Sequence, residues 1–329
     1  MNKNSRIFVA GHRGLVGSAI VRRLLALGFD NLLLRTHREL DLAEPSSTHQ
    51  FFESERPEFV IVAAAKVGGI HANSTLPGTF IHTNLSIQTN VLHEAWRAGV
   101  ERLLFLGSSC IYPRECRQPI KEDYLLTGQL EPTNSAYAVA KIAGIEMCRS
   151  YNVQYGMRFL AAMPTNMYGP GDNFDLETSH VLPALLRKTL EAAQNGDDEV
   201  VVWGTGEPRR EFLHSDDLAD GCVMLLSLDT ATFDDFMRSH YYPLINIGYG
   251  EDITIAELAQ LIARKVGYQG RLRFNSSRPD GTMRKLMDST RMRSLGWKPK
   301  IDLEQGIEQM IDRLRSQFPT PRTERAAAG

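Results

Sequence analysis

Short, continuously apolar segments alternate with longer segments of helical period through the first half of the chain. The apolar segments are 7–10, 32–34, 59–62, 103–106 and 159–162, and amphipathic helices are predicted over 15–27, 46–55, 85–98 and 137–155. Apolar strands that alternate with helices are typical of a parallel sheet covered on both faces, and right-handed crossovers make such a sheet doubly wound. We therefore predict an α/β protein with a doubly wound parallel sheet of Rossmann type.

The pattern is less regular after Pro164. Helices are predicted over 181–193, 218–226, 255–266 and 303–314, strands over 200–202 and 245–247, and loops over 166–175 and 276–285. We predict an NADP-binding domain over 1–172, with return segments around 211–247, and a smaller mixed α/β substrate-binding domain over 173–318. The tail over 319–329 has no apolar period and is expected to be disordered.

Composition narrows the classes of partner. The 329 residues carry a net charge of −2 without a basic block, which argues against nucleic-acid binding. The apolar segments are too short to span a membrane, and the polar N-terminal residues do not resemble a signal peptide. The four cysteines have neither C-x-x-C nor zinc spacing, so we expect a protein of the reducing cytoplasm without a membrane partner.

A glycine-rich loop connects the first predicted strand to the first helix. Its residues are Gly11, His12, Arg13, Gly14, Leu15, Val16 and Gly17, with the spacing G-x-x-G-x-x-G. Glycines at this position let the backbone approach a pyrophosphate at the helix N-terminus. A turn without a ligand is the alternative, but the flanking strand and helix favour nucleotide binding.

The end of the second predicted strand indicates which nucleotide is bound. An NAD site usually offers an acidic residue there to the ribose 2′-hydroxyl, and this chain has none before Glu39. Arg35 and Arg38, with Arg13, could instead bind a 2′-phosphate, unless they are ordinary solvated surface arginines. We therefore predict NADP(H) as the cofactor and place Asp41 near its adenine end.

Three polar residues are predicted to meet at the carboxyl edge of the sheet. Ser108 follows the strand 103–106, and Tyr137 and Lys141 share one face of a helix because they are four residues apart. A nearby ammonium would lower the pKa of the phenol, and Ser108 could bind the same substrate oxygen. The Tyr–Lys spacing alone is common by chance, but its combination with the glycine loop favours a reductase.

These motifs resemble the extended short-chain dehydrogenase/reductase family, and within it the GDP-L-fucose synthase family. The resemblance extends to about Trp297 and is carried by the segments GHRGLVG, AAAKVGGI, FLGSSCIYP, EPTNSAYAVAKIAG, MPTNMYGPGDNF, SHVLPALLRK and REFLHSDDLA. It implies conversion of GDP-4-keto-6-deoxy-D-mannose to GDP-L-fucose by epimerisation at C3 and C5, followed by reduction at C4 with NADPH. Analogy with related reductases also implies a homodimer formed by the helices from Leu85 and Tyr137.

The resemblance assigns further residues to the cofactor and to catalysis. The cofactor site would include Leu42, Ala64, Leu106, Gly107, Lys141, Pro164, Asn166, Met167 and His180. Cys110 and His180 would be the acid and base of epimerisation, without an order between them. The alternatives are a buried, inert Cys110 and an ordinary helix N-terminal His180, whose pKa the helix end would lower. We predict Cys148 and Cys222 to be helix core.

The second half offers cations and an indole for a GDP-sugar. Ser108, Ser109 and Asn166 would contact the sugar, and the nucleotide diphosphate would lie near Arg187, Lys188, Trp203, Arg210, Asp280 and Lys285. These basic residues could also be simply solvated. Lys188 stands where the family often has arginine, so it keeps the charge but not the bidentate geometry. We read His214, Asp216 and Asp217 as structural and predict no metal.

Two other functions remain open. A sibling enzyme could act on another GDP-4-keto sugar, in GDP-colitose or GDP-heptose synthesis, with the same fold and catalytic residues. A non-catalytic NADP-binding sensor would not need Tyr137 and Lys141, and both are present. A 4,6-dehydratase is disfavoured because Ser109 and Cys110 stand where that enzyme family carries a carboxylate.

Overall fold

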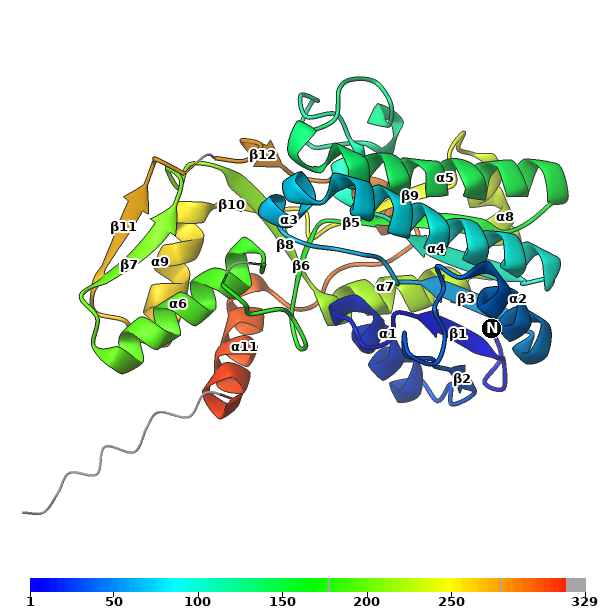
Figure 1. Ribbon diagram of the computed structural model, residues 1–329, viewed down its shortest axis with the longest axis horizontal. Helices are drawn as coiled ribbons and strands as arrows, with labels where there is room; N and C mark the ends of the chain where they lie inside the picture. The colour runs from blue at the N-terminus through cyan, green and yellow to red at the C-terminus, as the bar shows by residue number, and fades with distance from the viewer. Residues whose placement is uncertain (177, 279, 318–329) are drawn as a thin grey trace, which may run out of the picture.

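The computed structural model describes residues 1–176, 178–278 and 280–317 (Figure 1). The predicted tail over 319–329 therefore lies outside the described residues. Within the described part, no helix is long and apolar enough to cross a membrane.

Six parallel strands form the large sheet. Their order is β2(Leu32–Leu33), β1(Ile7–Ala10), β3(Phe59–Val62), β4(Arg102–Leu106), β5(Phe159–Pro164) and β9(Leu244–Ile247). Every residue of β1, β3, β4, β5 and β9 is buried, because helices cover the sheet on both sides. The predicted doubly wound α/β fold is confirmed.

Two apolar cores lie on opposite faces of this sheet. Along β1, Ile7 and Val9 belong to one core and Phe8 and Ala10 to the other, as the alternation of strand side chains requires. The first core includes residues of α1(Leu15–Ala26), α7(Ser215–Ser227) and α8(Thr230–Arg238), and the second those of α2(Pro45–Glu55), α4(Pro77–Arg97) and α5(Ser135–Tyr155). Cys222 and Cys148 are fully buried, one in each core, as predicted.

A smaller part lies beyond the carboxyl edge of the large sheet (Figure 1). Strand β8(Arg209–His214) pairs with β10(Asp252–Thr254), β12(Arg284–Lys285) and β6(Asn166–Tyr168), while β7(Glu199–Trp203) pairs with β11(Arg271–Asn275). A third core joins these strands to α6(Val181–Asn195), α9(Ile255–Val266) and α11(Leu303–Gln317). The shorter elements are α3(Ile70–Thr75), η1(Ser109–Ile111), η2(Glu122–Tyr124), η3(Pro132–Asn134) and α10(Thr290–Ser294).

Several elements differ from the sequence predictions. The helix expected from residue 85 begins at Pro77, because buried Asn84 bonds to the backbone of Lys66 and so stabilises polar first turns. The loops expected over 166–175 and 276–285 contain the short strands β6 and β12. Strands β8, β10 and β11 were not predicted, since ion pairs such as Arg209–Asp252 place charged residues on the strands and obscure an apolar pattern. Helix α8 was not predicted either.

Candidate active site

The carboxyl edge of the large sheet brings the predicted motifs together. The glycine loop follows β1, Ser108 follows β4, and Asn166 follows β5 where the chain enters β6 of the smaller sheet. A crevice at this edge of a doubly wound sheet is where such folds bind their ligands.

The glycine loop packs too tightly for side chains. Gly11 has a φ of 83°, and a Cβ there would lie 2.7 Å from the backbone nitrogen of Ala64. A Cβ on Gly17 would collide with the carbonyl oxygen of Gly11. No side chain caps the N-terminus of α1 at Gly14, and the buried Nδ1 of His12 has no partner among the described residues. This cradle fits the phosphates of a dinucleotide.

The arginines predicted for the cofactor lie beside this loop. Arg35 forms an ion pair with Glu55 at 2.5 Å and packs 5.8 Å from the ring centroid of Phe51, which fixes it against α2. Arg13 and Arg38 are exposed. Burial, with the nearby Arg13 guanidinium, lowers the pKa of His12, and Glu39 and the Arg35 backbone counteract this. These opposing contributions show that the loop and the segment after β2 are neighbours.

The other predicted cofactor residues differ in what they can offer. Asp41 is exposed and accepts a hydrogen bond from the Ala43 N–H at 2.9 Å. Leu42 has a buried side chain, and its carbonyl accepts from Asn90 at 3.0 Å. Ala64, Leu106, Gly107, Pro164 and Met167 lie on or next to β3, β4, β5 and β6. Ala64, Leu106, Gly107 and Pro164 therefore lie at the carboxyl ends of strands of the large sheet.

The predicted catalytic residues of α5 lie against β4. Lys141 is buried, and its Nζ donates to the carbonyl of Leu106 at 2.8 Å. The same Nζ lies 5.7 Å from the ring centroid of Tyr137 and 4.7 Å from that of Phe105. Ser108 Oγ accepts from the N–H of Cys110 at 3.4 Å and so begins η1.

The prediction that Lys141 lowers the pKa of Tyr137 is wrong for this structure. Burial raises the pKa of the phenol well above its usual value, and a charge on Cys110 would raise it further. Burial also lowers the pKa of Lys141, to about 8, and its ammonium bonds to a backbone carbonyl rather than to the phenol. Tyr137 is therefore a neutral phenol that can donate a proton.

Two lysines lie near Cys110. Its side chain is buried, and burial raises the pKa of the thiol, whereas the Lys285 ammonium, the Ser108 hydroxyl and Lys141 act in the opposite direction. The structure therefore brings Ser108, Cys110, Tyr137 and Lys141 together, with Lys285 as an additional neighbour. Ser109 follows Ser108 and is buried.

His180 immediately precedes α6, and its ring has no hydrogen-bond partner among the described residues. Partial loss of water lowers the pKa of the imidazole, although the side chain is open to solvent. An imidazole that lines a cleft is both accessible to solvent and partly desolvated, which accounts for its exposure and its lowered pKa together. The direction is the one predicted, but the cause is desolvation rather than the helix end.

The residues predicted for the nucleotide form two groups. Trp203 is 54% exposed at the end of β7, with Lys188 Nζ 4.7 Å and the Arg278 guanidinium 5.0 Å from its ring centroid. Arg210 of β8 pairs in register with Lys285 of β12 and lies beside Asp280, whose charge counteracts the lowering of the Arg210 pKa by burial.

Two predicted substrate residues are already engaged within the protein. Arg187 forms an ion pair with Glu191 at 2.7 Å and donates to the carbonyl of Phe174 at 3.1 Å. Asn166 donates to the carbonyl of Glu211 at 2.8 Å. Sequence reasoning missed Arg278, which only its place in the basic loop over 276–285 could have suggested.

Sequence reasoning also missed Glu211, a fully buried carboxylate in β8. It accepts from the N–H groups of Gly250 at 2.6 Å and Met287 at 2.9 Å, and burial raises its pKa. The bond to Met287 fixes the segment that carries Lys285. A charged residue inside a strand, between Arg210 and Phe212, was the available signal.

The residues interpreted as structural include His214 and Asp217, which accept hydrogen bonds from backbone N–H groups. His214 Nδ1 accepts from the Asp216 N–H at 3.2 Å and so caps α7, and Asp217 accepts from the N–H groups of Lys300 and Ile301 at 3.0 and 2.9 Å. Within residues 1–176, 178–278 and 280–317, no group of three His, Cys, Asp or Glu side chains is arranged to hold a metal.

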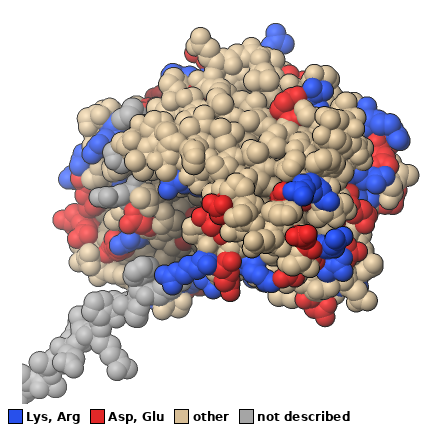
Figure 2. Space-filling model, turned by 45° about the vertical axis from the view of Figure 1, so that its right-hand side comes forward, with Lys and Arg blue, Asp and Glu red and all other residues tan. Residues whose placement is uncertain are grey.

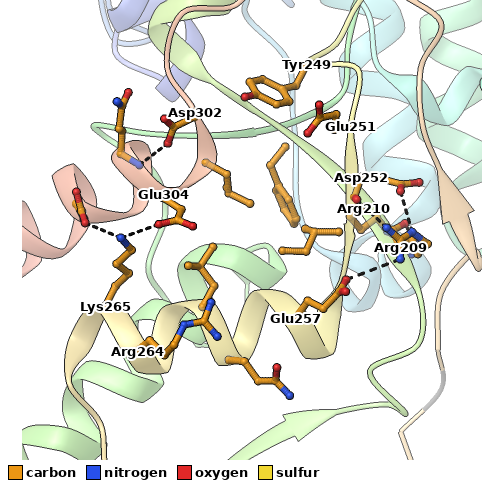
Figure 3. Close-up of a pocket in the computed structure, with 17 residues that line it drawn as sticks. Arg209, Arg210, Tyr249, Glu251, Asp252, Glu257, Arg264, Lys265, Asp302 and Glu304 are labelled. Atoms are coloured by element: carbon orange, nitrogen blue, oxygen red, sulfur yellow. Dashed lines mark hydrogen bonds and ion pairs between the residues drawn. The ribbon is translucent and has the colours of Figure 1, made fainter.

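A cavity of about 700 Å³ lies between β10, α9 and α11, and its wall includes Arg210 of β8 (Figure 3). Charged groups in its wall pair with one another, as in Arg209–Asp252 at 2.7 Å and Lys265–Glu304 at 2.8 Å. Neither Cys110 nor Tyr137 lines it. On the molecular face of Figure 2, basic and acidic residues are interspersed.

Comparison with known proteins identifies the family. The family model described as "NAD dependent epimerase/dehydratase family" matches residues 7–236. The chain belongs to this family. It is thus a member of a group of nicotinamide-dependent enzymes, in agreement with the fold and the glycine loop.

Relatives of known name are similar over nearly the whole chain. GDP-L-fucose synthase 1 of Arabidopsis thaliana is 57% identical over 94% of this chain and 93% of its own, and GDP-L-fucose synthase of Escherichia coli K12 is 53% identical over 92% and 94%. GDP-L-colitose synthase of Yersinia pseudotuberculosis is 38% identical over 92% and 96%.

Two solved structures have the same fold as this family member. A GDP-6-OMe-4-keto-L-xylo-heptose reductase from C. jejuni has a TM-score of 0.90 and 40% identity, covering 96% of this chain and 99% of its own. A GDP-L-fucose synthetase from Naegleria fowleri bound to NADP has a TM-score of 0.83 and 28% identity, covering 98% and 97%.

Proposed function

We propose that this chain converts GDP-4-keto-6-deoxy-D-mannose to GDP-L-fucose with NADPH. The observation that carries the proposal is the cluster of Ser108, Cys110, Tyr137 and Lys141 at the end of β4, in a chain 53–57% identical to two enzymes named for this product. The relative named for colitose is less similar, at 38% identity.

The residues of the cradle fit a dinucleotide. The unobstructed backbone at Gly11 and Gly17, the uncapped start of α1 and the unpartnered Nδ1 of His12 would hold its phosphates. Arg35 and Arg38 stand where an acidic residue would select NAD, which supports NADP. When bound, NADPH supplies the hydride for C4.

Epimerisation and reduction would use the same oxyanion site. The hydrogens on C3 and C5 are acidic because each carbon adjoins the C4 ketone, and loss of either gives an enolate. Ser108 and the neutral phenol of Tyr137 would donate hydrogen bonds to its oxygen, and the Lys141 ammonium lies close enough to stabilise that charge. Tyr137 would then give its proton to the same oxygen during reduction.

Cys110 and His180 would move the protons of C3 and C5. Burial raises the pKa of Cys110, and Lys285 and Ser108 counteract only part of this effect, so Cys110 is a thiol that can donate a proton. The lowered pKa of His180 keeps the imidazole neutral near pH 7 and able to accept a proton. Inversion requires groups on opposite faces of the sugar, and Cys110 lies in η1 after β4 whereas His180 immediately precedes α6, on different parts of the fold.

The substrate nucleotide would lie along the smaller part. The exposed indole of Trp203 offers a stacking surface, and Lys188, Arg210 and Lys285 offer charge to the diphosphate. Asp280 is oriented by Thr205, whose N–H and hydroxyl donate to it at 3.0 and 2.8 Å.

The division into an NADP-binding domain over 1–172 and a substrate domain over 173–318 is part of this proposal. We also propose a homodimer through α4 and α5, where Trp96 stacks on Tyr155 with 4.3 Å between centroids, and Val153 and Tyr155 are exposed. Light scattering at micromolar concentration should give twice the mass of one chain, and a monomer would contradict this interface.

Activity should fall at alkaline pH as Lys141 loses its proton. Its pKa is lowered to about 8, so the ammonium that stabilises the oxyanion is lost as pH rises through that value. We expect kcat/KM for reduction to decrease tenfold per pH unit above about pH 8. Stopped-flow NADPH oxidation across about pH 6 to 10 measures this, and a flat profile up to the upper limit would exclude the role.

The function is tested by following NADPH oxidation at 340 nm with GDP-4-keto-6-deoxy-D-mannose and identifying the product by mass and NMR. Formation of GDP-L-fucose supports the proposal. Reduction without inversion would keep the reductase and remove the Cys110–His180 pair. If the protein binds NADPH but leaves this substrate unchanged, the GDP-4-keto sugars of colitose or heptose synthesis are the next to assay, and inactivity on all of them would indicate a sensor.

A further inference from the structure

In the proposed reaction, one acid and one base cannot complete both inversions without exchanging protons with their surroundings. In a D-manno pyranose the hydrogens on C3 and C5 lie on the same face of the ring. One residue must therefore remove both protons, and the other must supply both from the opposite face. Each inversion leaves the base with one proton too many and the acid with one too few.

Both residues must therefore return to their starting protonation states, that is, be reset, between the two inversions. The base has to release a proton to water, and the acid has to take one from water. During this time the GDP-sugar and the cofactor occupy the crevice and exclude water from it. At least one member of the pair therefore needs contact with solvent on a side that the ligands do not cover.

A second cavity extends from Cys110 toward the surface. Its wall includes Ser109, Cys110 and Lys285, which belong to the proposed substrate site, and Arg114, Gln118, Glu131 and Thr282, which do not. Ser108, Tyr137, Lys141, Asn166 and His180 do not belong to its wall, so the cavity lies on another side of Cys110 from these residues. Its volume of about 10 Å³ is near the minimum for one water molecule, and the wall includes residues with polar side chains, Gln118, Glu131 and Thr282, that a water could bond to.

Glu131 connects this cavity with the surface. Its carboxylate is 21% exposed, forms an ion pair with Arg114 at 3.4 Å and lies near enough to Lys285 to influence its charge. The Lys285 ammonium also lowers the pKa of the Cys110 thiol, against the effect of burial, so the two groups are neighbours. Between the Cys110 thiol and the surface there are thus a cavity with space for a water, the Lys285 ammonium and the Glu131 carboxylate. Glu131 is partly exposed and can exchange protons with bulk solvent.

We propose that the cavity between Cys110 and Glu131 is a proton-exchange route that resets Cys110 between the two inversions while the substrate stays bound. If Cys110 is the acid, a proton passes from bulk solvent through Glu131 and a cavity water to the thiolate. If Cys110 is the base, the thiol proton leaves along the same path. His180 makes the complementary exchange, so no net charge accumulates. The inference rests on the proposed function.

The test uses Glu131→Gln, which removes the exchangeable carboxylate at nearly constant shape. Full turnover is run with NADPH in heavy water, and NMR reports configuration and deuterium at C3 and C5. The wild type should give product inverted and deuterated at both carbons. E131Q should still oxidise NADPH but release reduced sugar inverted at one carbon, increased about tenfold, because reduction overtakes the delayed second inversion.

Two further variants separate exchange from structural damage. Glu115→Gln removes an exposed carboxylate that does not line the cavity and should leave the product unchanged. Thr282→Leu should fill the cavity and give the singly inverted product although Glu131 is intact. This variant tests the proton-exchange route independently if E131Q does not fold. Formate, as a small proton carrier, should restore double inversion in E131Q but not in T282L.

Other results would overturn the proposal. Doubly inverted product from both E131Q and T282L would exclude this route. It would also be excluded if E131Q lost inversion and reduction equally and formate did not restore them. Failure of the proposed function looks different, because the wild type itself would then place no deuterium at C3 or C5.

Discussion

Replacing Tyr137 with phenylalanine should abolish reduction while leaving cofactor binding intact. The phenol is a neutral donor whose pKa burial raises, so its proton is available to the C4 oxygen as hydride arrives. Loss of a general acid costs about 10²- to 10⁴-fold in rate. Single-turnover NADPH oxidation should fall by that factor, whereas calorimetry should give an unchanged Kd for NADPH.

Epimerisation should suffer less than reduction in this variant, since Ser108 remains to bind the enolate oxygen. Tyr241→Phe provides the control, because Tyr241 is 72% exposed and outside the crevice. Turnover of Y137F at the wild-type rate would remove Tyr137 from the reaction.

Replacing Cys110 with alanine should stop inversion at C3 and C5. The thiol is buried beside Ser108 and Lys285, and it is the sulfur group at the oxyanion site. Exchange of deuterium from heavy water into both carbons should fall by at least about 10²-fold. NADPH should still be oxidised, and the reduced sugar should keep the configuration of the substrate at both carbons.

Two variants show whether the thiol itself is needed. Cys116→Ala removes a half-buried thiol six residues away and should leave exchange unchanged. Cys110→Ser keeps the size and a hydrogen-bond donor but has a far less acidic group, so it should resemble C110A. Deuterium exchange that persists in C110A would exclude Cys110 as acid or base.

The large sheet could be predicted because its strands are buried on both faces. Burial on both sides requires an apolar residue at every position, as in Phe59–Val62, and that pattern is visible without a structure. Strand β8 has no such pattern, because Arg209 is neutralised by Asp252 of the neighbouring strand. The first turns of α4 are equally hidden, since the partner of Asn84 is backbone distant in sequence.

The sequence predicts those features of the site that depend on the spacing of residues along the chain. Spacing placed Tyr137 and Lys141 on one helix face and the glycines between strand and helix. It does not determine burial, which is why the direction of the Tyr137 pKa was wrong. The contacts of Arg278 with Trp203, and of Glu131 with the cavity beside Cys110, depend on loops that only the tertiary fold brings together.

The order of the strands has a consequence for how the chain is made. Strand β9 completes the large sheet beside β5, but β6, α6, β7, β8, α7 and α8 all lie between them in sequence. Until residues 244–247 leave the ribosome, β5 is an unprotected edge with a fully buried, apolar sequence. Nascent chains and fragments that end earlier should therefore aggregate through this edge, and β9 is the segment that prevents it.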